Sequence, residues 1–322
     1  MERQALTSAH SSLTNQIGMP NQRVLITGAS GFIGLHLCRA LLSSGCEVHA
    51  LSRSEPKISD SRLNWHKVDL TDAEATRAAF ARIRAELVWH LCSYAQGEHE
   101  LALVLPTFRG EFETTVNVLV SATECGCKRL IMAGSLEESE PGDVPSSPYA
   151  AAKAASRIYA KMFHQLYGLP VVMTRIFMTY GPGQSVKKVI PHSISCLLRG
   201  NPLKIASPAR KVDWLYVEDL VHGLLAVAAA PGLEGKSVDL GSGELVEIRD
   251  VVGRIKRLIN PSAPVEFGTS PERALEQVRA ADSGTTYALT KWRPTISLDA
   301  GLERTVDAYA RCSGWRTSSR VL

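Results

Sequence analysis

Residues 23–34 read RVLITGASGFIG, and this stretch carries most of the information about the fold. It begins with a short apolar run that ends at Gly28, as a buried parallel strand does. Gly28, Gly31 and Gly34 follow at G-x-x-G-x-x-G spacing, and residues 32–45 then place apolar side chains at helical intervals. Glycine permits a tight turn and a close approach to a phosphate, and a helix N-terminus adds N–H donors and partial positive charge. This strand–loop–helix context predicts a dinucleotide pyrophosphate site rather than an ordinary turn.

The chain after this motif repeats the alternation of strand and helix. Short apolar runs predict strands at 47–53, 87–93, 128–135 and 170–177. Amphipathic patterns predict helices between them, at 71–85, 114–126 and 149–168. This order indicates right-handed βαβ units, and therefore an α/β fold with a Rossmann-type, doubly wound parallel sheet.

Beyond Tyr180 the alternation loosens into shorter helices and strand-like pieces. We therefore predict a disordered tail over residues 1–21 and a mainly Rossmann-type, NAD(P)-binding domain over 22–180. Residues 181–322 are predicted to form mainly a smaller substrate-binding lobe, with some chain returning to the first domain.

The bulk composition excludes several classes of protein. The chain has 322 residues, of which 45% are hydrophobic and 21% charged, and its formal charge is +4. It contains no Lys/Arg block of the kind that binds nucleic acid and no apolar run long enough to cross a bilayer. The first twenty residues lack the apolar centre of a secretion signal, and the seven cysteines are scattered without metal-ligand spacing. We expect a cytoplasmic protein with reduced thiols and no metal.

The end of the second predicted strand indicates which dinucleotide is preferred. Sites that prefer NAD usually place an acidic residue there, against the ribose 2′-hydroxyl. This chain has Ser52 and Arg53 instead, and a guanidinium would pair with a 2′-phosphate. The pattern favours NADP over NAD. The alternative is that Arg53 is a solvated loop residue and the site accepts NAD.

A second motif predicts the chemistry. Tyr149 and Lys153 are four residues apart in the predicted helix, so they share one face of it. A free tyrosine has a pKa near 10, and a nearby ammonium together with a positively charged nicotinamide would favour its phenolate. Tyr149 is then an acid/base for a substrate hydroxyl, and Ser135, at the end of the strand in AGSLEESEPG (133–142), is a hydrogen-bond partner for the reacting oxygen.

With the glycine loop and YAAAK (149–153) both in view, the sequence resembles the extended short-chain dehydrogenases/reductases. Within them it is similar to the nucleotide-sugar epimerase/dehydratase family, which contains UDP-glucose 4-epimerase. The likeness covers about residues 23–310. Further matching pieces are VDL (68–70), SPYAAAK (147–153), RIFMTYGPGQ (175–184), VDWLYVEDL (212–220), LGSGE (240–244) and WRPTISLDAGLERT (292–305).

The resemblance implies a set of site residues. Tyr149, Lys153 and Ser135 match the family's catalytic positions. Besides the three glycines, Ser52 and Arg53, the residues expected to contact the dinucleotide are Phe32, Ile33, Asp69, Leu70, Leu91, Cys92, Ser93 and Phe177.

The substrate side departs from the family's pattern. Met178 stands where an asparagine is frequent, and Val212 holds the position of the family's substrate-binding arginine. Binding of a substrate diphosphate therefore falls to Arg210 or Arg279, unless both are surface residues. Ser139 and Glu140 replace a Tyr-Gly pair, so the roof of the sugar pocket should differ.

The resemblance also implies activity and partners. The substrate would be a nucleotide-diphosphate sugar, handled at C4 through a 4-keto species by a 4-epimerase. An NADPH-dependent 4-ketoreductase is nearly as consistent, and a 4,6-dehydratase would use Glu137, two residues after Ser135, as the base. A reductase of a non-sugar carbonyl and a non-catalytic dinucleotide sensor are further alternatives. We expect a homodimer formed through the helix at 149–165 and the helix before it.

Overall fold

The computed structural model describes residues 21–54, 60–95, 97–268, 275 and 278–312. The tail predicted over residues 1–21 lies almost entirely outside the described residues. Within the described part, no helix is both long enough and apolar enough to cross a membrane.

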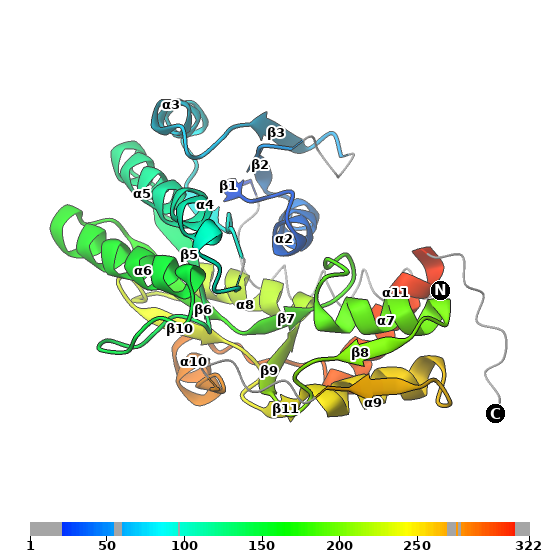
Figure 1. Ribbon diagram of the computed structural model, residues 1–322. Helices are drawn as coiled ribbons and strands as arrows, with labels where there is room; N and C mark the ends of the chain where they lie inside the picture. Colours follow the sequence, from blue (N-terminus) through cyan, green and yellow to red (C-terminus); the bar gives the residue numbers. More distant parts are fainter. Residues whose placement is uncertain (1–20, 55–59, 96, 269–274, 276–277, 313–322) are drawn as a thin grey trace.

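A seven-stranded sheet forms the centre of the molecule, with strand order β10-β6-β5-β4-β1-β2-β3 and parallel pairing throughout (Figure 1). Its strands are β1 (Arg23–Thr27), β2 (Glu47–Ser52), β3 (Leu63–Lys67), β4 (Leu87–His90), β5 (Arg129–Ser135), β6 (Val171–Ile176) and β10 (Ser237–Leu240). The sheet confirms the predicted α/β fold. The strand order reverses between β1 and β4, and ligands of such sheets bind at that point, beyond the carboxyl ends of the strands.

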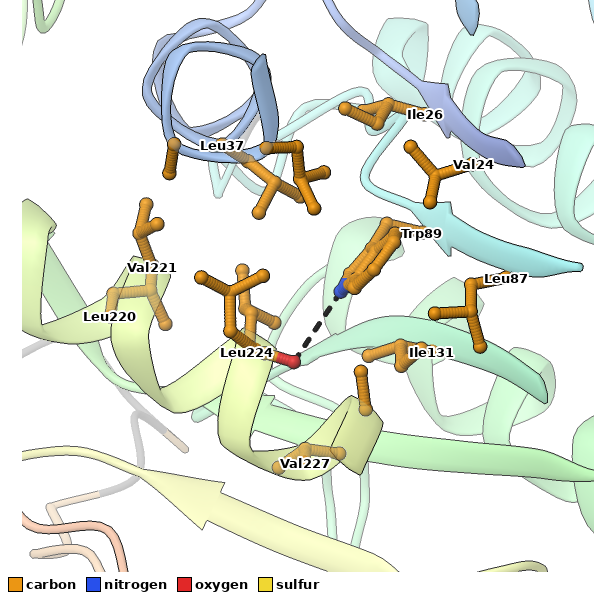
Figure 2. Packing of buried hydrophobic residues seen from close by; sticks show 14 of the residues in the cluster. Val24, Ile26, Leu37, Leu87, Trp89, Ile131, Leu220, Val221, Leu224 and Val227 are labelled. Carbon is orange, nitrogen blue, oxygen red and sulfur yellow. Dashed lines mark hydrogen bonds between the residues drawn. The ribbon is translucent and has the colours of Figure 1, made fainter. Parts of the chain in front are cut away.

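Helices cover both faces of this sheet. On one face lie α2 (Phe32–Ser43) and α8 (Val217–Ala229), and on the other lie α3 (Ala73–Ile83), α5 (Thr114–Cys125) and α6 (Pro148–Tyr167). Figure 2 shows the first face, where Trp89 of β4 packs between Leu37 of α2 and Leu224 of α8. Its indole N–H donates a hydrogen bond to the Leu224 carbonyl at 3.4 Å. This contact joins the centre of the sheet to a helix from the second half of the chain.

Most of the elements that follow β6 build a second, smaller body (Figure 1). A three-stranded sheet contains β7 (Met178–Tyr180), β9 (Lys211–Tyr216) and β11 (Leu245–Glu247), and a two-stranded sheet contains β8 (Leu203–Ile205) and β12 (Val265–Phe267). Helices α7 (Val189–Arg199), α9 (Ile248–Ile259) and α11 (Leu298–Cys312) share one hydrophobic cluster with these strands, while α10 (Ser283–Thr290) packs beside β10. The chain thus leaves the large sheet after β6 and returns to it with α8 and β10. The predicted division at residue 180 remains a prediction.

A helical segment in the first half of the chain was not predicted from the sequence. Before α5 the chain forms a 3-10 turn η1 (Leu101–Leu103), a short helix α4 (Val104–Thr107) and a π-helical segment η2 (Phe108–Glu113). Leu101, Leu105 and Phe108 of this segment are exposed, so its apolar residues do not show the amphipathic pattern of a core-facing helix. Pro106 further obscures the helical signal.

Candidate active site

The glycine loop lies between β1 and α2 and has no room for a side chain at Gly28 or Gly34. Gly28 has a φ of +69°, and a Cβ there would lie 2.6 Å from the backbone nitrogen of Cys92. A Cβ on Gly34 would lie 2.8 Å from the Cα of Ala29 and even closer to the Gly28 carbonyl oxygen. Gly31 caps α2, and the first turn of that helix, all within the described residues, carries no acidic side chain. Its N–H groups and helix dipole therefore suit an anion such as a pyrophosphate.

A pocket beside this loop, here called the dinucleotide pocket, gathers most of the predicted cofactor residues. Those that line it are Gly28, Gly31, Ser52, Arg53, Asp69, Leu70, Leu91, Cys92 and Ser93. The Ser52 hydroxyl donates to the Ser30 hydroxyl at 2.7 Å and accepts the Ser54 N–H at 3.0 Å. Arg53 is exposed and contributes a cation at the pocket's edge.

A second pocket, the catalytic pocket, adjoins the first, because Leu91 and Ser93 line both. The other predicted residues that line it are Phe32, Ile33, Ser135, Glu137, Tyr149, Lys153, Phe177 and Met178. Gln184 and Lys188, from the smaller body, also line it. The structure therefore brings together all four predicted catalytic residues next to the dinucleotide pocket.

Tyr149 and Lys153 lie on the first turns of α6, whose N-terminus is capped by the Ser147 hydroxyl. The Lys153 ammonium donates to the Ala133 carbonyl at 2.7 Å and lies 5.8 Å from the centre of the Tyr149 ring. Burial raises the pKa of Tyr149, while Lys153 and a hydrogen bond with Ser135 act in the opposite direction. In this geometry the lysine favours the phenolate but does not overcome the cost of burying it.

The three carboxylates of AGSLEESEPG have three different environments. Glu137 faces the catalytic pocket, and its backbone N–H donates to the Ser135 hydroxyl at 3.1 Å. Glu138 is 3% exposed, accepts the Ser135 N–H at 2.8 Å and pairs with Arg157 of α6 at 3.1 Å. Burial raises the pKa of Glu138. Glu140 lies at the surface and pairs with arginines.

Two of the buried carboxylates lie beside the predicted catalytic residues and were not predicted from the sequence. Glu138 fixes the end of β5, and Glu111 of η2 lies 2.7 Å from the Lys153 ammonium. Glu138 could have been suspected because it is three residues after Ser135. Glu111 had no local signal, because its partner is far away in the sequence.

The two arginines proposed for the substrate do not line either pocket. Arg279 pairs with Glu140 at 2.7 Å and also donates to the Glu138 carbonyl. Arg210 precedes β9, and its carbonyl accepts the Ile248 N–H. Their assignment to the substrate remains a prediction. Among the described residues that line the catalytic pocket, the cations are Lys153 and Lys188.

Comparisons with known proteins indicate the family to which the chain belongs. The sequence model of the NAD dependent epimerase/dehydratase family matches residues 24–241. The chain is 27% identical to a UDP-glucuronate 4-epimerase of Thermodesulfobacterium geofontis, over 88% of this chain and 94% of that protein. It is 28% identical to a dTDP-glucose 4,6-dehydratase of Haemophilus influenzae, over 89% and 97% of the respective chains.

Solved structures show the same fold. The Thermus thermophilus UDP-glucose 4-epimerase in complex with NAD superposes with a TM-score of 0.79 and 27% identity, covering 89% of this chain and 99% of that one. Three observations point to one conclusion: the glycine loop, the Tyr149–Lys153 pair, and the family match, which spans β1 to β10. The chain belongs to the NAD dependent epimerase/dehydratase family of enzymes.

Proposed function

We propose that the protein acts at C4 of a nucleotide-diphosphate sugar, through a 4-keto species, with Tyr149 as the acid/base. The observation that supports this most directly is the placement of Tyr149, Lys153 and Ser135 in one pocket that adjoins the dinucleotide pocket. The bound dinucleotide would supply the hydride chemistry. Tyr149 would remove the proton from the substrate hydroxyl on oxidation and return a proton to the oxygen on reduction. Ser135 would hold that oxygen by a hydrogen bond.

Two measurements on one preparation of the purified protein test this proposal. The purified protein is denatured and the released nucleotide identified by mass spectrometry, while intact protein is incubated with UDP- and dTDP-linked hexoses and followed by NMR. Nearly stoichiometric NAD⁺ or NADP⁺ together with a C4 epimer would support the epimerase. Consumption of added NADPH with a 4-keto sugar would indicate the reductase. A tightly bound nucleotide without conversion of any sugar would contradict the proposal and favour the sensor.

The preference for NADP is the finer part of the cofactor proposal. It is supported by Arg53 at the edge of the dinucleotide pocket and by Ser52 where an acid would favour NAD. Asp69, the acid that lines this pocket, already accepts hydrogen bonds from the backbone and side chain of Thr71. The same mass measurement separates the two dinucleotides, and release of NAD⁺ alone would overturn the NADP preference.

A dehydratase is the second candidate, because Glu137 lines the catalytic pocket with Tyr149. A carboxylate there would remove the C5 proton once C4 is a ketone. For a dehydratase, Glu137→Gln should reduce formation of the 4-keto-6-deoxy product by roughly 10²–10⁴-fold while reduction of the bound dinucleotide persists. Stopped-flow absorbance at 340 nm measures the first step, and NMR measures the product. Glu113→Gln, outside the pocket, is the control. Unchanged product formation in Glu137→Gln would remove the carboxylate from the mechanism.

We further propose that two copies associate through α6 and the preceding helix α5, together with the segment that leads into α5. Exposed apolar side chains lie on α6 and on that segment, and Ile158, Leu166 and Leu105 are each more than half exposed, at 61%, 65% and 64%. Large exposed apolar patches mark interaction sites in many proteins. Sedimentation velocity at micromolar concentration should show a dimer, and Ile158→Asp with Leu166→Asp should shift it to monomer. A monomeric wild-type protein would contradict this proposal.

A further inference from the structure

Glu111 is a buried carboxylate that the mechanism above does not use. It lies in η2, and only 1% of it is exposed. Its Oε1 lies 2.7 Å from the Lys153 ammonium, and its Oε2 accepts a hydrogen bond from the Ser93 hydroxyl at 2.6 Å. The Tyr94 N–H also donates to Oε2, at 3.3 Å. Glu111 therefore links the catalytic lysine to the loop that lines the dinucleotide pocket.

The backbone around Glu111 is unusual. π-Helical turns are rare and occur frequently at functional sites, because the wider turn redirects a side chain. Here the Glu111 carbonyl accepts hydrogen bonds from the hydroxyls of Thr114 and Thr115, at 3.1 and 2.7 Å. These bonds hold the segment where it joins α5 and fix the carboxylate in the wall of the site.

The Lys153 ammonium and this carboxylate form a buried pair, with 2.7 Å between them. Burial alone would lower the pKa of the Lys153 ammonium, but Glu111 and Tyr149 outweigh burial and the pKa is raised. Lys153 therefore stays protonated. The electrostatic effect of its positive charge on Tyr149 is opposed by the nearby Glu111 carboxylate. Burial raises the pKa of Tyr149 most, and Glu111 raises it further.

Two other carboxylates act in the same direction as Glu111, with smaller effects. Glu137 raises the pKa of Tyr149, and Glu138 raises the pKa of Lys153. Burial lowers the pKa of His90 to about 3 and raises the pKa of Cys92 to about 11, so both are uncharged at neutral pH.

We propose that Glu111 is a positioning residue, which holds the Lys153 ammonium in place and offsets part of its charge at Tyr149. Tyr149 then exchanges its proton with the substrate oxygen in both directions: its O–H bond breaks as the proton passes to an alkoxide and forms again as a substrate hydroxyl gives its proton up, while Lys153 stabilises the phenolate. This inference rests on the proposed function for the role of Tyr149. The coupling of the three side chains is a property of the protein alone and is measurable without substrate.

The test is a spectrophotometric titration of tyrosinate at 295 nm. Each protein is compared with the same protein carrying Tyr149→Phe, so that the difference reports Tyr149. Glu111→Gln should lower the pH at which Tyr149 titrates by roughly one unit or more, and Lys153→Met should raise it by a similar amount. In the double variant both charges are gone, and the titration should return to within about half a unit of wild type. Glu113→Gln, on the same segment, is the matched control and should not shift it.

The outcomes separate the two proposals. The proposed role of Glu111 would be overturned if Lys153→Met shifted the titration of Tyr149 and Glu111→Gln left it unchanged. If Glu111→Gln does not fold, the double variant Glu111→Gln with Lys153→Met tests the charge balance instead, because it removes both partners of the buried ion pair together. A double variant that titrates well above wild type would then reject the charge balance. Absence of sugar turnover would reject the proposed function alone, since the titration involves neither substrate nor dinucleotide.

Discussion

Tyr149→Phe should lower turnover of the nucleotide sugar by roughly 10²–10⁴-fold, the usual contribution of a positioned acid/base. The phenyl ring keeps the packing of α6, but the proton that the substrate oxygen gains or loses no longer has a carrier. Dinucleotide binding should remain, because the glycine loop lies between β1 and α2 and Tyr149 does not line the dinucleotide pocket. Steady-state kinetics with NMR detection measures the first effect, and isothermal titration calorimetry measures the second.

Tyr167→Phe is the matched control. Tyr167 is on the same helix, is 56% exposed and lies outside the catalytic pocket, so its variant should retain full turnover. Equal losses in the two variants would mean that α6 itself is disturbed. Undiminished turnover in Tyr149→Phe would place the acid/base elsewhere.

Gly34→Ala should destabilise the protein by about 1–3 kcal/mol and weaken dinucleotide binding strongly, because a single methyl group overpacks the loop. The added Cβ would meet backbone, 2.8 Å from the Cα of Ala29, and backbone cannot rotate away as a side chain can. The loop would have to move at the point where α2 presents its N–H groups. Urea denaturation measures the free energy of unfolding, and calorimetry measures the dinucleotide Kd.

Gly253→Ala provides the comparison. Gly253 is also inside a helix, α9, but a Cβ there would meet, among the described residues, only the Arg257 guanidinium, at 3.7 Å. Alanine should stabilise this position by about 0.5–1 kcal/mol, since glycine is the poorer helix former. If Gly34→Ala also stabilised the protein, the loop would have room for a methyl group, and the close packing of α2 against β1 would not be needed for stability or dinucleotide binding.

The central sheet was predictable because its signal is local. A parallel strand buried on both faces is a short apolar run, and β1, β5 and β6 each read that way from the sequence. The glycine loop and the Tyr149–Lys153 pair were equally accessible, since each depends on spacings of a few residues. The segment that precedes α5 was missed because its apolar residues face outward and are interrupted by proline.

The electrostatics of the site could not be predicted in the same way. The lysine was expected to favour the phenolate of Tyr149, but that expectation lacked Glu111, which reaches Lys153 from η2. Similarly, nothing in the sequence indicated that Arg279 pairs with Glu140. Both pairs join residues far apart in the chain, and only the folded topology decides which charges meet.

The return of the chain to β10 has a consequence for how the molecule is made. β10 pairs with β6, and α8 covers the face of the sheet that holds Trp89, yet both follow the excursion into β7, α7 and β9. During synthesis the earlier strands would emerge with one edge and part of one face still open to water. Such long-range closure slows folding and prolongs the exposure of apolar surface to other chains. A nascent protein truncated before β10 is therefore expected to depend on chaperones, even though its glycine loop is complete.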